Sequence, residues 1–472
     1  MSIVSPPPLA HQRRNSLGEP ASLAPAPIAP PTDAPARISP RRDLQASLGD
    51  AISYSVMVGI GETYFAAFAL ALNTGETFAG LLSTLPMLAG GILQLFTPWL
   101  VRRAQSLRLY AYVCVALQAA SLLLLPLAAC FTGSAAGLAI FAAITMYWAF
   151  GLASAPVWNT WIEEIVPHTV RTNFFARRAR ISQFTTLIGF VVGAIALQLG
   201  KAGGWLRPAF VGIFLTAAVC RFLSAGFLRS QSDPSAGRVP VNYISIRKLL
   251  RGQAGELGGK LVLYLLAVQT AVQISGPYFA PFMLAKEKMS YLTFMLLIGI
   301  AFMGKVVSLP LWGRVAHTAG PKRLLWIAGM AIVPVAGLWV FGDLFPVAET
   351  SLRLNLGFAD LSLPLSAKIG YYCVVQILSG FAWGGFELAV SLMLLQAIPR
   401  SQRTSMMTLY NCGNAAALVV GSLCGAAILQ SMHESHAAYL TLFGLSSSMR
   451  LVTLLFLARA SSAGAGKTPP KS

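Results

Sequence analysis

Charged residues are scarce in this sequence of 472 residues: they make up 11% of it, and acidic residues number 16 against 35 Lys and Arg. So few charges cannot cover the surface of a soluble protein of this size. The six cysteines stand singly, without a C-x-x-C pair, so neither disulfides nor metal clusters are expected. No G-x-S-x-G motif occurs. These absences argue against an enzyme, and we expect no cofactor and no metal.

Hydrophobic residues make up 56% of the chain and gather in stretches near the ~20 residues that cross a bilayer. The sequence predicts an all-α polytopic membrane protein with twelve transmembrane helices in two pseudo-symmetric six-helix bundles. The first six spans are expected at 53–72, 78–100, 109–131, 136–162, 174–199 and 209–228, and the second six at 260–284, 291–312, 324–341, 369–397, 406–429 and 438–457.

Polar and proline-rich segments between these spans set the expected domain boundaries. We predict a disordered Pro-rich cytoplasmic tail at 1–49, an N-terminal bundle at 50–228, a cytoplasmic linker at 229–259, a C-terminal bundle at 260–459 and a disordered tail at 460–472.

Basic residues predict the orientation of the spans. Both tails and alternate loops hold 26 Lys and Arg, whereas the other loops hold 6. The positive-inside rule therefore places both termini in the cytoplasm. We expect a monomer in a bacterial inner (plasma) membrane, in contact with anionic lipid and with no nucleic-acid partner.

The two sets of six spans repeat each other. Pro167-x3-Arg171-Thr172 follows the fourth span, and Pro399-x3-Arg403-Thr404 follows the tenth. This repetition indicates a duplicated six-helix unit with an outer insertion, 342–366, in the second copy. Further matches are Tyr64 with Tyr278, Gly90 with Gly304, Gly189 and Gly193 with Gly421 and Gly425, and Arg221 with Arg450.

The repeated motif has two interpretations. In the favoured one, proline ends a helix, Thr or Ser caps the next one, and Arg171 and Arg403 mark the cytoplasmic boundary. In the other, these arginines pair with acids such as Glu163 or Glu164 to form an inner gate. The Gly-x3-Gly pairs predict close helix packing.

These features together resemble the major facilitator superfamily of transporters, over nearly all of residues 50 to 459. A version of the family's loop pattern appears between the eighth and ninth spans at Gly313, His317 and Gly320. Histidine stands where the family has aspartate, and Val101 stands there in the first half. The resemblance implies that this aspartate locks the closed state, a contact that this chain is not expected to make.

Ionisable residues at membrane depth are costly and are therefore functional candidates. Glu62, Lys305 and Glu387 are placed far from both ends of their predicted helices, roughly 14 to 18 Å deep at about 1.5 Å per residue. Arg221 and Arg450 lie about two turns from a boundary arginine and are expected to extend their side chains toward the interface.

Lys305 aligns with Gly91 of the first half, so the shared scaffold does not require a lysine there. Its expected partner is Glu387, with Glu62 as second choice. The pair would hold one conformation until a proton or an anionic part of the substrate displaces one member. Alternatively, the pair is static or the lysine reaches the cytoplasmic interface.

The resemblance also implies a central cavity lined mainly by spans one, four, seven and ten. Bends for alternating access are expected at Gly384–Gly385 and at Pro277 and Pro281. The aromatic and amide side chains offered to this cavity can equally serve as helix-packing contacts. Besides the charged groups, they are Tyr64, Asn159, Gln269, Gln273, Tyr278, Gln376 and Trp383.

Two function classes remain open. The favoured one is a secondary active transporter that moves a small solute by alternating access, coupled to protons through Glu62 or Glu387. The alternative is a transport-inactive relative that acts as a membrane receptor or assembly partner. The segment His433 to His436 (HESH) falls in a short outer loop and is expected to have too few partners for a metal site.

Overall fold

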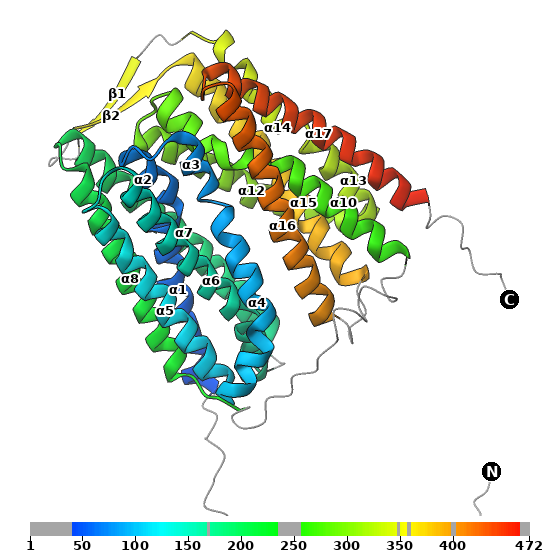
Figure 1. Cartoon of the computed structure of the whole chain (residues 1–472). Helices are drawn as coiled ribbons and strands as arrows, with labels where there is room; N and C mark the ends of the chain where they lie inside the picture. Colours follow the sequence, from blue (N-terminus) through cyan, green and yellow to red (C-terminus); the bar gives the residue numbers. More distant parts are fainter. Residues whose placement is uncertain are drawn as a thin grey trace, which may run out of the picture. The chain divides into compact units, whose positions relative to one another are not determined.

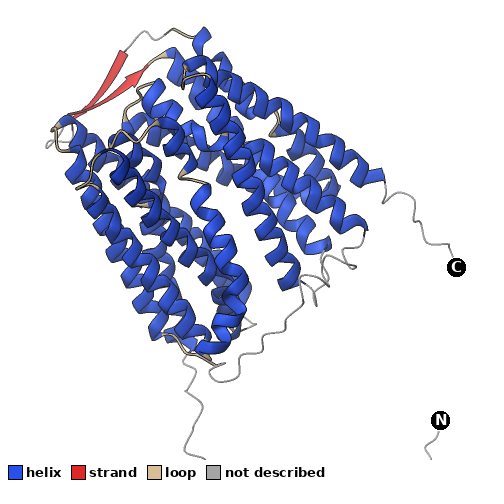
Figure 2. Ribbon diagram, in the orientation of Figure 1, coloured by secondary structure: helices blue, strands red, loops and turns tan. Residues whose placement is uncertain are grey.

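The computed structural model describes residues 40–167, 170–234, 256–346, 350–355, 360–397 and 403–462. Within these ranges, twelve helical segments are long and apolar enough to cross a membrane. They run side by side, and a small two-stranded hairpin lies at one end of the bundle (Figures 1 and 2). The predicted fold class is confirmed, with the hairpin as an addition.

The N-terminal half contains spans one to six (Figure 1). Spans one and two are each broken, whereas the other four are single helices. The segments are α1 (Pro40–Ile60), η1 (Glu62–Tyr64), α2 (Phe65–Ala71), α3 (Glu76–Leu81), α4 (Leu85–Ala104), α5 (Leu107–Ala128), α6 (Gly133–Ile165), α7 (Arg171–Ala202) and α8 (Leu206–Ser230).

The C-terminal half contains spans seven to twelve, and its broken spans are seven and nine. The segments are α10 (Glu256–Gln273), η2 (Gly276–Tyr278), α11 (Phe279–Pro281), η3 (Phe282–Lys286), α12 (Tyr291–Ala319), α13 (Pro321–Ala331), α14 (Pro334–Gly337), η4 (Leu338–Leu344), α15 (Ala367–Ala397), α16 (Arg403–Ser431) and α17 (His436–Ser462). Between η4 and α15, β1 (Thr350–Asn355) pairs antiparallel with β2 (Asp360–Leu365).

The ends of the first and last spans correct the predicted boundaries. Helix α1 already includes Pro40, ten residues before the expected start of the bundle, and Asp43 and Ser47 are buried. Helix α17 continues to Ser462, past the expected end at residue 459. Polar residues in the first turns of α1 look like a tail in sequence, but they pack into the bundle.

The breaks in spans one and seven occur at equivalent places. Span one changes to a 3-10 turn at Glu62, and span seven changes to one at Gly276 and then to a π turn. Pro277 and Pro281 lie in this second break, as predicted, because proline removes a helix hydrogen bond. At Gly384–Gly385, where a bend is also expected, α15 continues without a break in the helix.

The Gly-x3-Gly pairs pack against the first helix of their own half. A Cβ on Gly189 would lie 2.6 Å from the carbonyl oxygen of Val56, and one on Gly421 would lie 2.3 Å from that of Thr270. Only glycine permits such an approach. Val56 and Thr270 are equivalent at the register that aligns Tyr64 with Tyr278, so the duplication holds in three dimensions.

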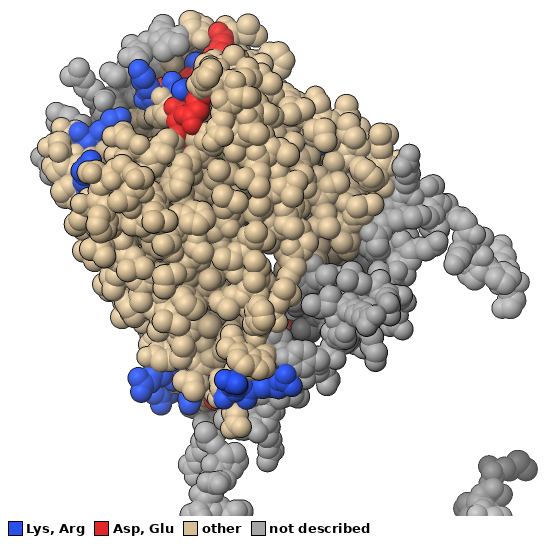
Figure 3. All heavy atoms as spheres, in the orientation of Figure 1, with Lys and Arg blue, Asp and Glu red and all other residues tan. Residues whose placement is uncertain are grey.

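One face of the molecule carries its charges at two edges (Figure 3). On the face in Figure 3, Lys and Arg gather at the lower edge, whereas Lys, Arg, Asp and Glu mix at the upper edge, near the hairpin. The band between them shows almost no charged side chain. This distribution suits helices that cross a hydrocarbon layer, and the chain is an integral membrane protein.

Candidate functional site

Each half encloses a cavity beside its broken first span. We call the N-terminal one cavity A. It measures about 230 Å³ and is lined from α1, η1, α5, α6, α7 and α8. Its polar lining includes Asp50, Glu62, Gln118, Arg178 and Arg221. Cavity A is therefore rich in charge although it lies inside an apolar bundle.

A chain of contacts joins most of these groups. Arg178 forms an ion pair of 3.0 Å with Oδ2 of Asp50, whose other oxygen accepts a hydrogen bond from Ser224. Arg221 donates to Ser224 and to Oε1 of Gln118. Its guanidinium also lies 4.6 Å from the ring centroid of Tyr54. Each of these charges thus has a partner, as burial requires.

Glu62 lies at the break in span one and faces cavity A. The hydroxyl of Tyr147 donates to its Oε2 at 2.5 Å. The break places this carboxylate on a short 3-10 turn between α1 and α2. Irregular backbone at membrane depth is tolerated where it lines a cavity or is buried in protein. Glu62 is therefore an acid inside the bundle with one strong hydrogen-bond donor.

Cavity B is the C-terminal counterpart and measures about 330 Å³. Its wall is mainly apolar, and its polar members are Ser379 and the predicted residues Gln376 and Trp383, together with Arg450. Arg450 is 3% exposed and donates to the carbonyl oxygen of Ile332 at 3.0 Å. Among the described residues, no Asp or Glu lines this cavity.

Lys305 and Glu387 meet as the sequence predicts. Lys305 lies halfway along α12, and its Nζ is 2.5 Å from Oε2 of Glu387 on α15. The Lys305 side chain is 31% exposed and that of Glu387 is 53% exposed. The predicted partner is confirmed, and its role in a transport cycle stays a prediction.

Two acids join the halves at the end that carries the hairpin, here called the hairpin end. Glu76, which begins α3, pairs with Lys286 at 3.0 Å and accepts a hydrogen bond from Tyr439. Glu434, between α16 and α17, accepts from both the backbone and the hydroxyl of Thr77, at 3.0 and 2.6 Å. Each half therefore contributes one acid that binds the other half.

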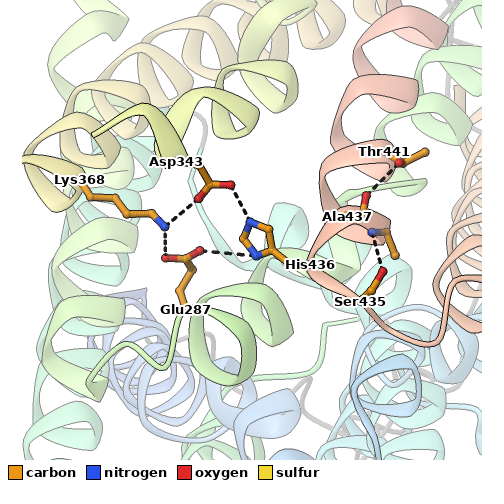
Figure 4. Close-up of polar contacts among 8 residues, drawn as sticks. Glu287, Asp343, Lys368, Ser435, His436, Ala437 and Thr441 are labelled. Atoms are coloured by element: carbon orange, nitrogen blue, oxygen red, sulfur yellow. Dashed lines mark hydrogen bonds and ion pairs between the residues drawn. The ribbon is translucent and has the colours of Figure 1, made fainter. Parts of the chain in front are cut away.

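A second charged cluster ties together the C-terminal spans at the hairpin end (Figure 4). Lys368 contacts Glu287 at 2.7 Å and Asp343 at 3.0 Å. His436 contacts Asp343 at 2.7 Å. The carboxylates and the histidine could hold a metal ion, but the Lys368 ammonium already binds both carboxylates. Within the His433–His436 segment, Glu434 and His436 thus both make structural contacts.

Several predicted site residues serve packing. Tyr64 and Tyr278 are fully buried, and their hydroxyls donate to the carbonyl oxygens of Phe190 and Ser422, each at 2.6 Å. These equivalent contacts support the packing interpretation that the sequence leaves open. Asn159, Gln269 and Gln273 line neither cavity A nor cavity B.

The repeated boundary motif is structural in the first half. Arg171 donates to the carbonyl oxygens of Glu163 and Val166, so it caps the end of α6 and does not pair with the Glu163 carboxylate. The predicted Thr cap is wrong, because Val170 precedes α7 and makes no side-chain cap. Arg403 begins α16, and the residues before it, 398–402, lie outside the described ranges.

The loop motif between spans eight and nine forms a tight helix junction. Gly320 has φ +82°, a conformation that favours glycine, and it ends α12 immediately before Pro321 begins α13. His317 lies exposed in the last turn of α12, and Gly313 lies earlier in that helix. Val101, the first-half counterpart of His317, is 3% exposed.

The sequence does not reveal the partners of the buried arginines. Arg221 and Arg450 are 5% and 3% exposed, so the expected extension toward the interface is wrong. The predicted boundaries put Asp50 at a helix end, but it lies buried within α1. The sequence carries one signal for these cavities, its internal duplication, which aligns Arg221 with Arg450 and Glu62 with Gly276.

No protein-family profile and no curated protein sequence matches the chain. Solved structures do match. The nucleoside transporter NupG aligns with TM-score 0.60 and 14% identity over 89% of this chain and 99% of that one. A bacterial homologue of the iron transporter ferroportin, in an inward-facing state, gives TM-score 0.65 and 13% identity over 90% and 100%.

A POT family transporter in complex with a thioalcohol-conjugated peptide aligns similarly, with TM-score 0.62 and 13% identity over 89% of this chain and 96% of that one. At such low identities the likeness establishes the fold alone. The chain has the fold of the major facilitator transporters, as the resemblance in sequence implies.

Proposed function

We propose that this protein is a secondary active transporter, which moves a small solute by alternating access and couples that movement to protons at Glu62. The observation that carries this proposal is the position of Glu62. Its carboxylate sits at the break of span one, bonded to Tyr147 and facing cavity A. An acid that can gain or lose a proton beside a helix break can link protonation to helix movement.

The polar chain in cavity A supplies a route to Glu62. Asp50 lies halfway along α1, between Glu62 and the start of the helix at Pro40, and pairs with Arg178 on α7. These two residues and Arg221 line the same cavity as Glu62. In this proposal, water beside these charged groups carries protons over the remaining distance. Glu62 would thus exchange protons with the side of the membrane opposite the hairpin end.

The contacts at the hairpin end act as the outer gate in this proposal. Glu76 and Glu434 bind across the two halves there. The count of 26 basic residues against 6 supports a cytoplasmic location for the other end. The Lys305–Glu387 pair would hold one conformation until a proton or a solute group replaces one partner.

The test is solute-induced proton flux in vesicles that contain the purified chain, screened with sugars, amino acids, peptides, nucleosides and organic acids. We expect at least one solute to move protons, and Glu62→Gln to reduce that flux at least tenfold with normal expression. The matched control is Glu163→Gln, an exposed acid on α6, which should behave like the parent. Undiminished proton flux in Glu62→Gln would remove Glu62 as the coupling site. If no solute of the panel induces proton flux, the result would favour the alternative that the protein is a transport-inactive receptor.

A further inference from the structure

Cavity B contains a buried arginine that lacks an acidic partner. Arg450 Nη1 donates to Ile332, and Nη2 lies at the weak distance of 3.4 Å from Oγ of Ser275. Nε is buried and has no hydrogen-bond partner among the described residues. No carboxylate in that part of the chain lies within ion-pair distance of this guanidinium. A buried, uncompensated cation is costly unless an anion joins it.

The duplicated fold shows how the two cavities differ, although Arg221 itself contacts Gln118 and Ser224 and not Glu62. In the register that aligns Tyr64 with Tyr278, Gly276 occupies the place of Glu62. Gly276 lines cavity B as Glu62 lines cavity A. The C-terminal half thus keeps the arginine but lacks the acid, and its cavity is the larger of the two, about 330 against 230 Å³.

We propose that cavity B binds the carboxylate of a small organic acid with an apolar body, and that this acid is the transported solute or part of it. This inference rests on the proposed transport function. Arg450 lines cavity B, and a guanidinium presents parallel N–H donors that match the two oxygens of a carboxylate.

The rest of the wall defines the body of the ligand. Gln376, Ser379 and Trp383 supply the other polar side chains of the cavity wall. The remaining wall is apolar, and a volume above about 300 Å³ with few polar groups is typical of small-molecule sites. One arginine balances one negative charge, so a monocarboxylate fits better than a dianionic phosphate. The apolar wall includes Phe279, Phe294, Ile298, Val335 and Trp339.

Calorimetric binding to the full chain in detergent, without any gradient, tests this site. The probes are phenylacetate and hexanoate with their neutral amides. We expect at least one acid to bind and its amide to bind at least tenfold more weakly. Arg450→Gln should weaken binding of the acid at least tenfold. Failure of both acids to bind, or equal binding of acid and amide, would overturn the proposal.

A matched pair of variants guards against misfolding of Arg450→Gln. Gly276→Glu restores the acid that the N-terminal half has, and Gly276→Gln adds the same bulk without charge. A Cβ here would lie 3.0 Å from the flexible end of Gln273, which can move aside. We expect Gly276→Glu to weaken carboxylate binding at least tenfold and Gly276→Gln to change it less than threefold. Equal effects of the two variants would contradict an anion site.

The two proposals fail separately. Tight carboxylate binding without movement of any solute would leave cavity B as an anion site and defeat the transport function. Proton-coupled movement of other solutes by a chain that binds neither acid would leave the transport function and defeat the anion site.

Discussion

In the N-terminal half, Arg221 shares its cavity with Asp50 and Glu62, whereas in the C-terminal half Arg450 shares its cavity with no acidic side chain of the described residues. The backbones around them match, down to the glycine contacts at Val56 and Thr270. Duplication has therefore preserved helix packing while the charges inside the two halves diverged. In the two proposals above, the N-terminal half handles protons and the C-terminal half handles the solute.

The largest expected difference between the halves is in stability. Asp50 aligns with Tyr264 in the shared register. Removing Asp50 leaves Arg178 and Ser224 without their partner, and loss of one member of a buried ion pair costs about 3–5 kcal/mol. Asp50→Ala should therefore lower the melting temperature strongly in detergent.

Tyr264→Phe provides the comparison for this prediction. The Tyr264 hydroxyl is buried without a hydrogen-bond partner in the described part of the chain, so removing it should leave stability unchanged or raise it. The same melting assay measures both variants. A larger loss in Tyr264→Phe than in Asp50→Ala would show that the charged network of cavity A is not what stabilises its half.

A second difference concerns the pair on α12 and α15. Lys305 has Gly91 as its counterpart, so this ion pair belongs to the C-terminal half alone. Both side chains are partly exposed, and such pairs contribute only about 0–1 kcal/mol to stability. We therefore expect Lys305→Ala and Glu387→Ala to leave the melting temperature nearly unchanged but to reduce transport about tenfold each.

The double variant measures coupling between the two residues. If they act as a pair, Lys305→Ala with Glu387→Ala should transport better than the product of the two single losses predicts. Arg314→Ala, exposed on the same helix, is the control and should transport normally. Independent losses, or normal transport by Lys305→Ala, would leave Lys305 as an anchor only.

The sequence predicts the helices and their duplication well because apolar length and glycine spacing are local properties. It also predicts the Lys305–Glu387 contact, because the family resemblance implies that spans eight and ten are neighbours and similar depth then limits the possible partners. The sequence prediction fails at the start of span one. Asp43 and Ser47 lie in a polar stretch that is typical of a tail, and only the structure shows that they are buried and that Asp43 binds Ser232.

The polar contacts between the halves also cannot be predicted from the sequence. Thr77 and Glu434 lie 357 residues apart, and nothing in either local pattern points to the other. The prediction for Arg221 fails for a related reason. An arginine two helical turns from an interface can reach water with its side chain. Only the packed bundle shows that Arg221 instead contacts Gln118 and Ser224.

The smallest expected effect tests the likeness of the halves. Tyr64 and Tyr278 each donate one hydrogen bond of 2.6 Å to a backbone carbonyl, and each ring packs on a glycine, Gly193 or Gly425. Loss of one such bond costs about 0.5–1.5 kcal/mol. Tyr64→Phe and Tyr278→Phe should thus lower the melting temperature modestly and to a similar degree. The control is Tyr112→Phe, which should change it less, because the half-buried Tyr112 ring lies 5.7 Å from the Arg229 guanidinium and Phe keeps that ring. A large loss of melting temperature in one tyrosine variant and none in the other would mean that only one half depends on this contact. The two halves would then share the packing geometry but not its contribution to stability.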